Sequence, residues 1–323
     1  MRIMGVLALL WSACALGQAA AQGNATKGAA QAYPVRPVQV IIAYPPGGAV
    51  DVMACNLINT IQPQMNQQFV VVNRDGASGA IGFGVLANST PDSYTLGAGP
   101  TTPMSITPHL MKNIKFGVDS FEYICQSFEN VFTMEVPQES PYRTVTELLA
   151  AVKESPGKIT YGSGGIGTVP QLTVTNLMWR SKLSITGVSY RGEAPMLLDL
   201  LAGRLSFDSP SVSLASGRNL RVLAVFADTR HVTFPDAPTF KELGLPSMPP
   251  GLNGLFAPKG TPPAILKRLE DACEKAVQSE SFTRAAKLMH AQIAYLGSAA
   301  FRARAIEDYR YKGELIRELD LRM

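Results

Sequence analysis

Two glycine-rich turns hold the residues that are best suited to bind an anion. The first runs from Tyr44 to Asp51, where two prolines precede Gly47 and Gly48. Because glycine has no Cβ, such a turn exposes backbone N–H groups, and a helix that begins there offers its positive dipole end to an anion. The turn has no Gly-Lys-Ser/Thr, so it does not predict nucleoside triphosphate binding. The segment is equally consistent with a loop that binds a carboxylate ligand and with a tight turn capped by Asp51.

The second turn runs from Tyr161 to Thr168 and has the spacing Gly-x-Gly-x-x-Gly at Gly162, Gly164 and Gly167. A dinucleotide-binding turn has this spacing together with an acidic residue about 20 positions later. Tyr190 stands near that place instead. We therefore expect a second anion-binding turn, with no cofactor.

The residues that could catalyse a reaction lack recognisable partners. The segment from Gly76 to Gly79 only approaches the Gly-x-Ser-x-Gly nucleophile elbow, and the three histidines are isolated from it and from one another. None has the spacing of a metal ligand. We expect no catalytic residue and no metal site. The alternative is a secreted enzyme with Ser163 or Asp51 as its reactive group.

The cysteines are compatible with export and do not require a disulfide. Cys55, Cys125 and Cys273 are widely separated, with no Cys-x-x-Cys pair, so at most one bridge can form. Cys55 and Cys273 lie in helical patterns, which favours buried thiols.

The first 21 residues have the features of an export signal. Arg2 is followed by the apolar run Ile3 to Leu10 and by the small residues Ala19 to Ala21. Processing as a lipoprotein within Trp11 to Cys14 is the alternative. Cleavage after residue 21 predicts a periplasmic protein.

Composition excludes several classes of protein. The chain has 323 residues, 46% hydrophobic and 17% charged, with 28 Gly and 23 Pro that follow no period, so it is neither disordered nor collagen-like. Without Arg2 the balance is 28 basic against 25 acidic residues, or +3, and no basic cluster predicts a nucleic-acid partner. No apolar run approaches the roughly 20 residues of a membrane span.

The elements that position the two turns alternate between strand and helix. Met53, Leu57, Ile61 and Met65 mark one face of a helix that follows the first strand. This alternation is typical of βα units with a largely parallel sheet. We expect strands at 38–43, 69–72, 94–98, 158–161, 185–190 and 220–227, and helices at 50–66, 79–88, 144–153, 169–180 and 194–202.

The last third of the chain predicts a discontinuous architecture. After two Pro-rich passages, only helical patterns are evident from Pro263 to Leu321. Helices alone cannot readily form a small domain here, so we expect them to pack on the first βα units. The chain also exceeds the size of one core. The predicted lobes are 33–128 with 250–323, and 129–249, with a ligand cleft at the carboxyl ends of the strands.

Several blocks together resemble a known family. The chain is similar to the Bug-type periplasmic substrate-binding proteins of tripartite tricarboxylate transporters. The resemblance rests on blocks in one order: Tyr44 to Gly48 with Asp51, Asn73 to Gly82, Pro91 to Leu96, Pro156 to Tyr161, Gly165 to Thr168, Tyr190 to Pro195, and Leu220 to Val225.

This resemblance implies a fold, a ligand and a partner. The fold is that of a type II periplasmic binding protein, with two α/β lobes that close around a ligand like a Venus flytrap. The implied activity is binding without chemistry, by a monomer, of a small organic carboxylate. The implied partners are the membrane permease subunits of the transporter. A sensor that passes its liganded state to a signalling protein is an alternative to transport.

The resemblance also assigns site residues. The two strand-to-helix loops would hold a ligand carboxylate through backbone groups and ordered water. Relatives commonly have Ser and then His after the second turn, whereas Val169 and Gln171 follow it here, so we expect the distal part of the ligand to differ. The expected ligand-binding residues are Tyr44, Pro46, Gly47, Gly48, Asp51, Ser163, Gly164, Gly165, Thr168, Gln171 and Asp208.

The sequence leaves the roles of two of these residues open. Asp51 would accept a hydrogen bond from an amino or amide group of the ligand, or cap its helix. The direction of Asp208 depends on strand register, because a shift of one residue turns a side chain to the other face.

Overall fold

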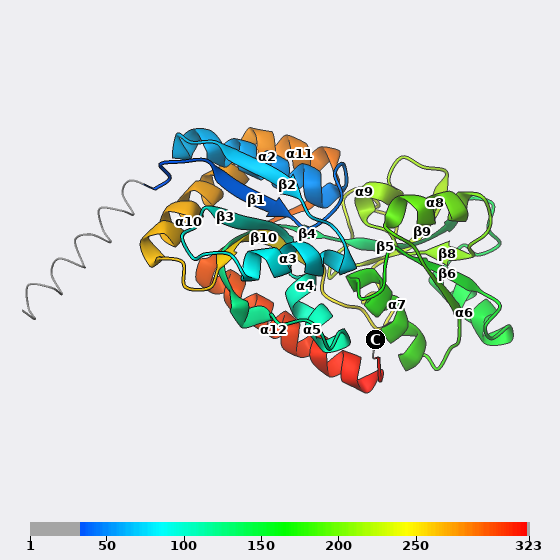
Figure 1. The fold of residues 1–323 in the computed structure, drawn as a ribbon. Helices are drawn as coiled ribbons and strands as arrows, with labels where there is room; N and C mark the ends of the chain where they lie inside the picture. The colour runs from blue at the N-terminus through cyan, green and yellow to red at the C-terminus, as the bar shows by residue number, and fades with distance from the viewer. Residues whose placement is uncertain (1–32, 322–323) are drawn as a thin grey trace, which may run out of the picture.

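The computed structural model describes residues 33–321, and the predicted leader at 1–21 lies outside this range. Two β-sheets, each with its own helices, form two lobes side by side (Figure 1). The predicted two-lobe α/β fold is confirmed. Within residues 33–321, no helix is both long and apolar enough to cross a membrane.

The first lobe contains a six-stranded sheet whose parallel part is formed by the first three strands. Strand β1 (Val38–Ile42) lies between β2 (Phe69–Asn73) and β3 (Thr95–Pro100) and is parallel to both. Most residues of β1 and β2 are β-branched, as is typical of strands inside a sheet. Because parallel strands end at the same edge, the loops that follow them gather at one place.

The remaining strands of this sheet are antiparallel. Strand β10 (Gly251–Pro258) pairs with β3 on one side and with β4 (Phe121–Asn130) on the other. Strand β11 (Gln292–Gly297) forms the edge beside β4. Along β10, Leu255 and Phe256 belong to the cores on opposite faces of the sheet, because successive side chains alternate.

Helices cover both faces of the first sheet (Figure 1). Helix α2 packs with the C-terminal helices α10 and α11 over one face, which confirms that these helices return to the first βα unit. Helices α3 and α12 pack over the other face. The helices of this lobe are α2 (Ala49–Met65), η1 (Ala77–Gly79), α3 (Ala80–Ala87), α4 (Thr102–Ser105), α5 (Thr107–Leu110), η2 (Val118–Ser120), α10 (Pro263–Val277), α11 (Glu280–Leu288) and α12 (Ser298–Glu318).

The second lobe contains a five-stranded sheet in the order β7-β6-β8-β5-β9. Strand β6 (Thr160–Ser163) is parallel to β7 (Thr186–Ser189) and β8 (Phe207–Asp208). Strand β5 (Phe132–Pro137) is antiparallel to β8 and to β9 (Leu220–Phe226). Its helices are α6 (Val145–Glu154), α7 (Val169–Arg180), α8 (Glu193–Leu201) and α9 (Val212–Ala215).

The lobes are joined at two strand connections and by a helix end. The chain passes from β4 to β5 through Val131, and from β9 to β10 through the Pro-rich passage before Gly251. The C-terminal turn of α12 also reaches the second lobe, where Leu315 and Ile316 pack in its core. Arg180 of α7 forms an ion pair with Glu318 of α12 at 3.2 Å.

Strands β10 and β11 were not predicted from the sequence. The prediction that only helices follow Pro263 was wrong, because β11 lies between α11 and α12. Strand β11 is a partly exposed edge strand with a short, mixed sequence, so it has no clear alternation. Strand β10 is buried at every position and contains Gly and Pro, which hide its pattern.

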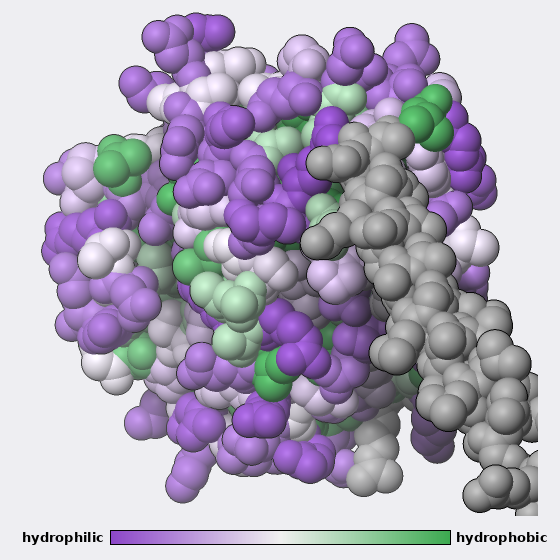
Figure 2. Space-filling model, turned by 90° about the vertical axis from the view of Figure 1, so that its left-hand side faces the viewer, coloured by the Kyte–Doolittle hydropathy of each residue, from purple (hydrophilic) through white to green (hydrophobic). Residues whose placement is uncertain are grey.

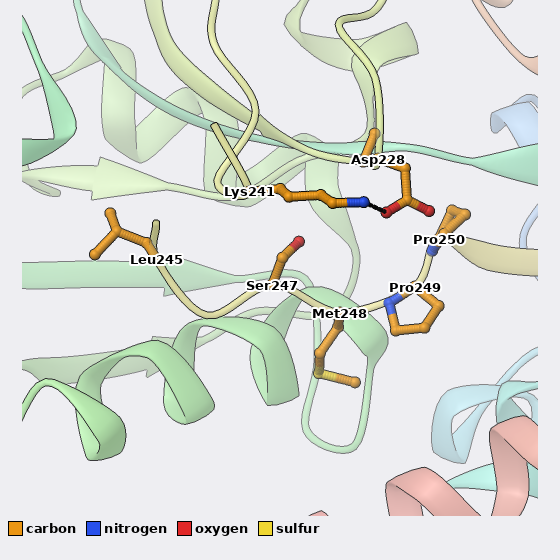
Figure 3. A pocket seen from close by; sticks show the side chains of 8 residues that line it. Asp228, Lys241, Leu245, Ser247, Met248, Pro249 and Pro250 are labelled. Carbon is orange, nitrogen blue, oxygen red and sulfur yellow. Dashed lines mark hydrogen bonds and ion pairs between the residues drawn. The ribbon is translucent and has the colours of Figure 1, made fainter. Parts of the chain in front are cut away.

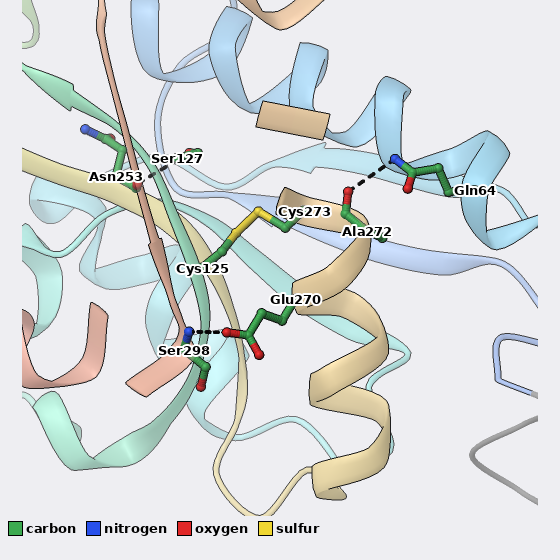
Figure 4. The surroundings of a disulfide bond; sticks show 8 residues. All are labelled: Gln64, Cys125, Ser127, Asn253, Glu270, Ala272, Cys273 and Ser298. Carbon is green, nitrogen blue, oxygen red and sulfur yellow. Dashed lines mark hydrogen bonds between the residues drawn. A yellow bond between two sulfur atoms is a disulfide. The ribbon is translucent and has the colours of Figure 1, made fainter. Parts of the chain in front are cut away.

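The cysteines also correct an expectation. Cys125 of β4 and Cys273 of α10 form a disulfide, with their Cα atoms 6.6 Å apart (Figure 4). The expectation of buried thiols was therefore wrong for Cys273. Cys55 is free and half-buried in α2. The disulfide joins the sheet of the first lobe to the layer of helices that covers one of its faces.

The outer end of the first lobe is mainly hydrophilic. Figure 2 shows charged and polar side chains over most of this face, with apolar side chains scattered between them. Single exposed apolar residues are normal on a protein surface and do not mark a binding site.

Candidate functional site

The first glycine turn connects β1 to α2 and is organised by Asp51. Gly47 has φ +83°, which glycine adopts without strain. Its N–H donates to Oδ2 of Asp51 at 2.8 Å, and the side-chain amide of Asn73 donates to Oδ1 at 2.7 Å. Asp51 is 8% exposed, so its carboxylate is fully engaged in holding this turn. This favours the structural interpretation of Asp51 over a ligand contact.

The exposed part of this turn is Pro45, Pro46, Gly47 and Gly48. Gly48 stands at the N-cap of α2 without a side-chain cap. The first N–H groups of a helix have no partner within it, so those of α2 remain as donors at this surface. The N–H of Gly47 is used by Asp51 and Pro46 has no N–H, so the two residues shape the turn.

The second turn connects β6 to α7 and has the same internal design. The N–H of Gly167 donates to Oε1 of Gln171 at 2.6 Å, with the same four-residue spacing as Gly47 and Asp51. The Thr168 hydroxyl donates to the carbonyl of Gly165 at 2.9 Å and does not cap α7, although Thr168 is its N-cap residue. The N-terminal N–H groups of α7 therefore also lack a side-chain partner.

Ser163 and Gly164 fix the second turn to its neighbours. The carbonyls of these residues accept the N–H groups of Tyr190 at 2.9 Å and Gly192 at 3.0 Å. The Ser163 hydroxyl is nearly buried and lies 3.4 Å from the hydroxyl of Ser189. It thus has another serine as its neighbour and no hydrogen-bonded base, which gives no support to a nucleophilic role.

Ser78 connects the two turns across the lobes. Its hydroxyl donates to the carbonyl of Ile166 in the second turn at 2.6 Å, and its own carbonyl accepts the Tyr44 hydroxyl at 3.4 Å. Ala77 and Ser78 have φ of +47° and +53°, a region that residues other than glycine rarely adopt. Such strain persists where the surroundings over-determine the backbone, as at binding sites.

Further contacts bring the second turn close to the first lobe. A Cβ at Gly167 would lie 3.0 Å from Cδ1 of Leu110 in α5. Burial raises the pKa of the Tyr44 phenol far above its usual range, the Thr102 hydroxyl opposes this shift, and the Glu193 charge from the second lobe adds to it. Tyr44, Ser78 and Thr102 follow the three parallel strands of the first lobe, so these strand ends face the second turn.

Asp208 lies inside the second lobe. It is fully buried on β8, directly opposite Glu135 of β5. A Cβ at Gly162 would lie 3.5 Å from its Cβ, so Asp208 flanks the strand that leads into the second turn. Nearby, Glu193 accepts from the N–H and hydroxyl of Ser211 at 3.2 and 2.7 Å. Burial raises the pKa of these three carboxyls.

Four of these residues were not among the ligand-binding residues predicted from the sequence. Ser78 lies in the block Asn73 to Gly82 that carries the resemblance, but the only role considered for it was that of a nucleophile; the glycine-rich loop after β2 was the available signal. Thr102 follows β3, a strand that was predicted to end two residues earlier. Glu135 carried no signal, and Glu193 stood out only as part of the block Tyr190 to Pro195, because the importance of both depends on contacts between distant segments.

No metal site is evident in the described part of the chain. Residues 33–321 contain no group of three His, Cys, Asp or Glu side chains that could hold an ion. A pocket of about 320 Å³ does occur beside the connection into β10, where Asp228 and Lys241 form an ion pair at 3.3 Å (Figure 3). It contains none of the expected site residues. Its lining consists of Ala227, Asp228, Lys241, Leu245, Ser247, Met248, Pro249 and Pro250.

Comparison with known proteins identifies the family to which the chain is similar. The family described as the tripartite tricarboxylate transporter family receptor matches residues 53–321. A protein from the gbd 5' region of Cupriavidus necator is 31% identical over 95% of this chain and 94% of its own length. Protein BugT of Bordetella pertussis is 33% identical over 82% of this chain and 84% of its own length.

Solved structures have the same fold. A TctC solute-binding protein from Polaromonas is 30% identical, with a TM-score of 0.73, over 88% of this chain and 99% of its own. Two proteins of Rhodopseudomonas palustris, solved with adipate and with malate, are each 22% identical, with TM-scores of 0.82 and 0.78. They cover 90% and 88% of this chain and 100% of their own. The chain belongs to the tripartite tricarboxylate transporter receptor family.

Proposed function

We propose that the protein is a periplasmic receptor that holds a small organic carboxylate between its lobes and delivers it to the permease of a tripartite tricarboxylate transporter. The observation that carries this proposal is the bridge at Ser78. Through it, Tyr44 at the start of the first turn and Ile166 in the second are connected by two hydrogen bonds.

The chemistry of the turns supports an anionic ligand. Helix α2 has 17 residues and α7 has 12, and neither has a side chain that caps its N-terminus. The unpaired N–H groups and the positive dipole ends of these helices stabilise negative charge. Closure around a carboxylate would bring donors from both lobes to it, and the ligand favours the closed form to the extent that it binds that form better.

The ligand class receives support from the relatives. Two proteins of the same fold were solved with adipate and malate, which are both dicarboxylates. We propose that this protein also takes an organic carboxylate, and that Val169 and Gln171 alter the region around its distal part. We expect direct contacts from Tyr44, Gly48, Gly164, Gly165 and the first turn of α7.

The organisation proposed for the molecule follows from this function. The first lobe comprises 33–128 with 250–323, and the second comprises 129–249. The leader at 1–21 would direct export to the periplasm, where permease subunits are accessible. We propose binding without catalysis, because Asp51 is engaged in its own turn and Ser163 has only Ser189 as its hydroxyl neighbour.

A binding survey tests this function. The protein without residues 1–21 is examined by thermal shift and calorimetry with malate, adipate, citrate, aspartate and benzoate. A carboxylate at 100 times its Kd should raise the free energy of unfolding by about 2.7 kcal/mol. Methyl esters of the same acids serve as controls, because they keep the shape and lose the charge. The proposal fails if no acid stabilises the protein, or if esters bind as tightly as acids.

A further inference from the structure

Two buried carboxyls face one another behind the second turn. Glu135 of β5 and Asp208 of β8 are directly paired in the sheet, and both are 0% exposed. None of their four carboxylate oxygens has a hydrogen-bond donor within residues 33–321. Ser209 next to Asp208 also has a buried hydroxyl without a partner. This unmet demand for donors is unusual, because buried polar groups are normally hydrogen-bonded.

A shared proton meets this demand. Two ionised carboxylates in contact repel each other, and burial removes the water that would stabilise them. One proton between the two side chains relieves the repulsion and supplies a hydrogen bond. Burial is accordingly the largest influence on both carboxyls, and it raises the pKa of each.

The surroundings add mainly negative charge. Glu193 of α8 raises the pKa of both carboxyls, while Arg218 before β9 opposes the shift at Glu135. Two phenols also interact with Asp208, Tyr161 of β6 and Tyr190 after β7, and their own pKa values are raised.

The pair lies next to the backbone that forms the second turn. Asp208 is in register with Gly162, which is one residue before Ser163. Glu193 contacts the turn itself, because a Cβ at Gly164 would lie 3.1 Å from its Cγ. A negative ligand held at this turn would therefore act on the pair through the low-dielectric interior of the lobe.

We propose that Glu135 and Asp208 share one proton and that this pair makes ligand binding proton-linked. The inference rests on the proposed function, since it needs an anionic ligand at the second turn. The ligand's negative charge raises the affinity of the pair for its proton. If the pair is deprotonated before binding, up to one proton is taken from solvent with each ligand; if it is protonated, none is taken.

The direction in which pH changes the carboxylate affinity follows from this linkage. At low pH the pair is protonated with and without ligand, and the affinity for the carboxylate is greatest. As the pH rises through the pKa of the pair, the affinity falls. If the ligand raises this pKa by one unit, the total loss of affinity is about tenfold.

The first experiment examines the ligand-free protein. Carbon-13 NMR of the side-chain carboxyls should show a resonance that titrates above neutral pH. This titration should disappear in the double variant with Glu135→Gln and Asp208→Asn, which has neither carboxyl. Glu139→Gln, at an exposed carboxylate beyond β5, should leave it unchanged. Absence of the titration from the unaltered protein would overturn the shared proton.

The second experiment measures linkage with malate, adipate and benzoate as probes. Calorimetry at about pH 6 and about pH 9 should show about tenfold weaker binding at the higher pH, and the double variant with Glu135→Gln and Asp208→Asn should bind equally at both. Equal affinities of the unaltered protein at the two pH values would overturn the proton linkage of binding and leave the shared proton standing. If no probe binds at either pH, the proposed function fails and the linkage fails with it, while the NMR titration still decides whether the proton is shared.

Discussion

Asp51 and Gln171 have the same position in the two turns. Each accepts the N–H of a glycine four residues earlier, and each lies in the first turn of the helix that follows. One acceptor is charged and the other is neutral. This repeated design closes both turns while it leaves the first N–H groups of each helix for another partner.

A charge placed at Gly48 tests whether those N–H groups bind the ligand. Gly48→Asp puts a carboxylate at the N-cap of α2, where φ is −77° and a Cβ meets only Pro45 O at 3.9 Å. Asp is a favoured N-cap, so the free energy of unfolding should change by less than about 1 kcal/mol. Repulsion of a carboxylate ligand should weaken binding by more than about tenfold.

Thr144→Asp is the matched control. Thr144 is the exposed N-cap of α6, and its side chain already accepts the N–H of Glu147. The same added charge there should leave the affinity unchanged when measured by calorimetry. Normal binding by Gly48→Asp would exclude the start of α2 from the ligand site.

At the scale of elements, the pairing of β5 with β8 makes stability depend on pH. Burial raises the pKa of Glu135 and Asp208, so the folded protein holds a proton that the unfolded chain releases. The stabilisation is complete below the unfolded pKa of about 4 and is lost as the pH rises through the folded value. Urea unfolding at about pH 6 and about pH 9 should therefore show lower stability at the higher pH.

The amide variants check this dependence. The double variant with Glu135→Gln and Asp208→Asn removes both titrating groups, so it should lose less stability between the two pH values. Glu139→Gln should retain the full loss. An equal loss in the double variant would assign the pH dependence to other groups.

The disulfide between β4 and α10 makes a second prediction at this scale. It closes a loop across a sequence separation of 148 residues, and removing such a bridge typically lowers the free energy of unfolding by about 2–5 kcal/mol. Replacing both Cys125 and Cys273 by Ala should produce this loss in urea unfolding. Carboxylate affinity should persist, because α10 packs on α2 and β4, away from the second lobe. Cys55→Ala is the control and should lower the free energy of unfolding by less than the replacement of Cys125 and Cys273. A larger loss in Cys55→Ala would contradict this account.

At the scale of the whole molecule, the lobes are held by more than their two strand connections. The end of α12 packs in the core of the second lobe, and Ser78 bonds to Ile166 at the other side of the interface. Relative motion of the lobes must therefore change at least one of these contacts.

The Ser78 contact is predicted to favour the closed form. Ser78→Ala removes its hydroxyl bond to Ile166, which is worth about 0.5–1.5 kcal/mol. The closed form should become less populated, so the carboxylate affinity should fall by up to about tenfold. Small-angle X-ray scattering should show a larger radius of gyration without ligand.

A serine within one lobe provides the control. Ser89 donates its hydroxyl to the carbonyl of Val85 in α3, so Ser89→Ala removes a bond that does not cross the interface. It should leave both affinity and radius unchanged. Ser78→Ala with unaltered affinity and radius would show that this contact does not influence closure.

The local pattern of the chain was enough to predict the βα units. Helix α7 has the predicted bounds, and β1, α2, β2 and α8 differ by only a few residues, because their apolar spacing reports one buried face. Strand β4 was missed because it buries polar residues such as Gln126 and Glu129, whose burial depends on partners elsewhere, including Arg304. Its sequence therefore lacks an apolar alternation.

The sequence by itself determined the two glycine turns, because glycine, proline and the start of a helix are local features. Only the tertiary structure decided that Ser78 bridges them, that Asp208 faces Glu135, and that Cys125 bonds to Cys273. These contacts join residues 73 to 148 positions apart along the chain. Their distances are set by the packing of sheets and lobes, which no local spacing records.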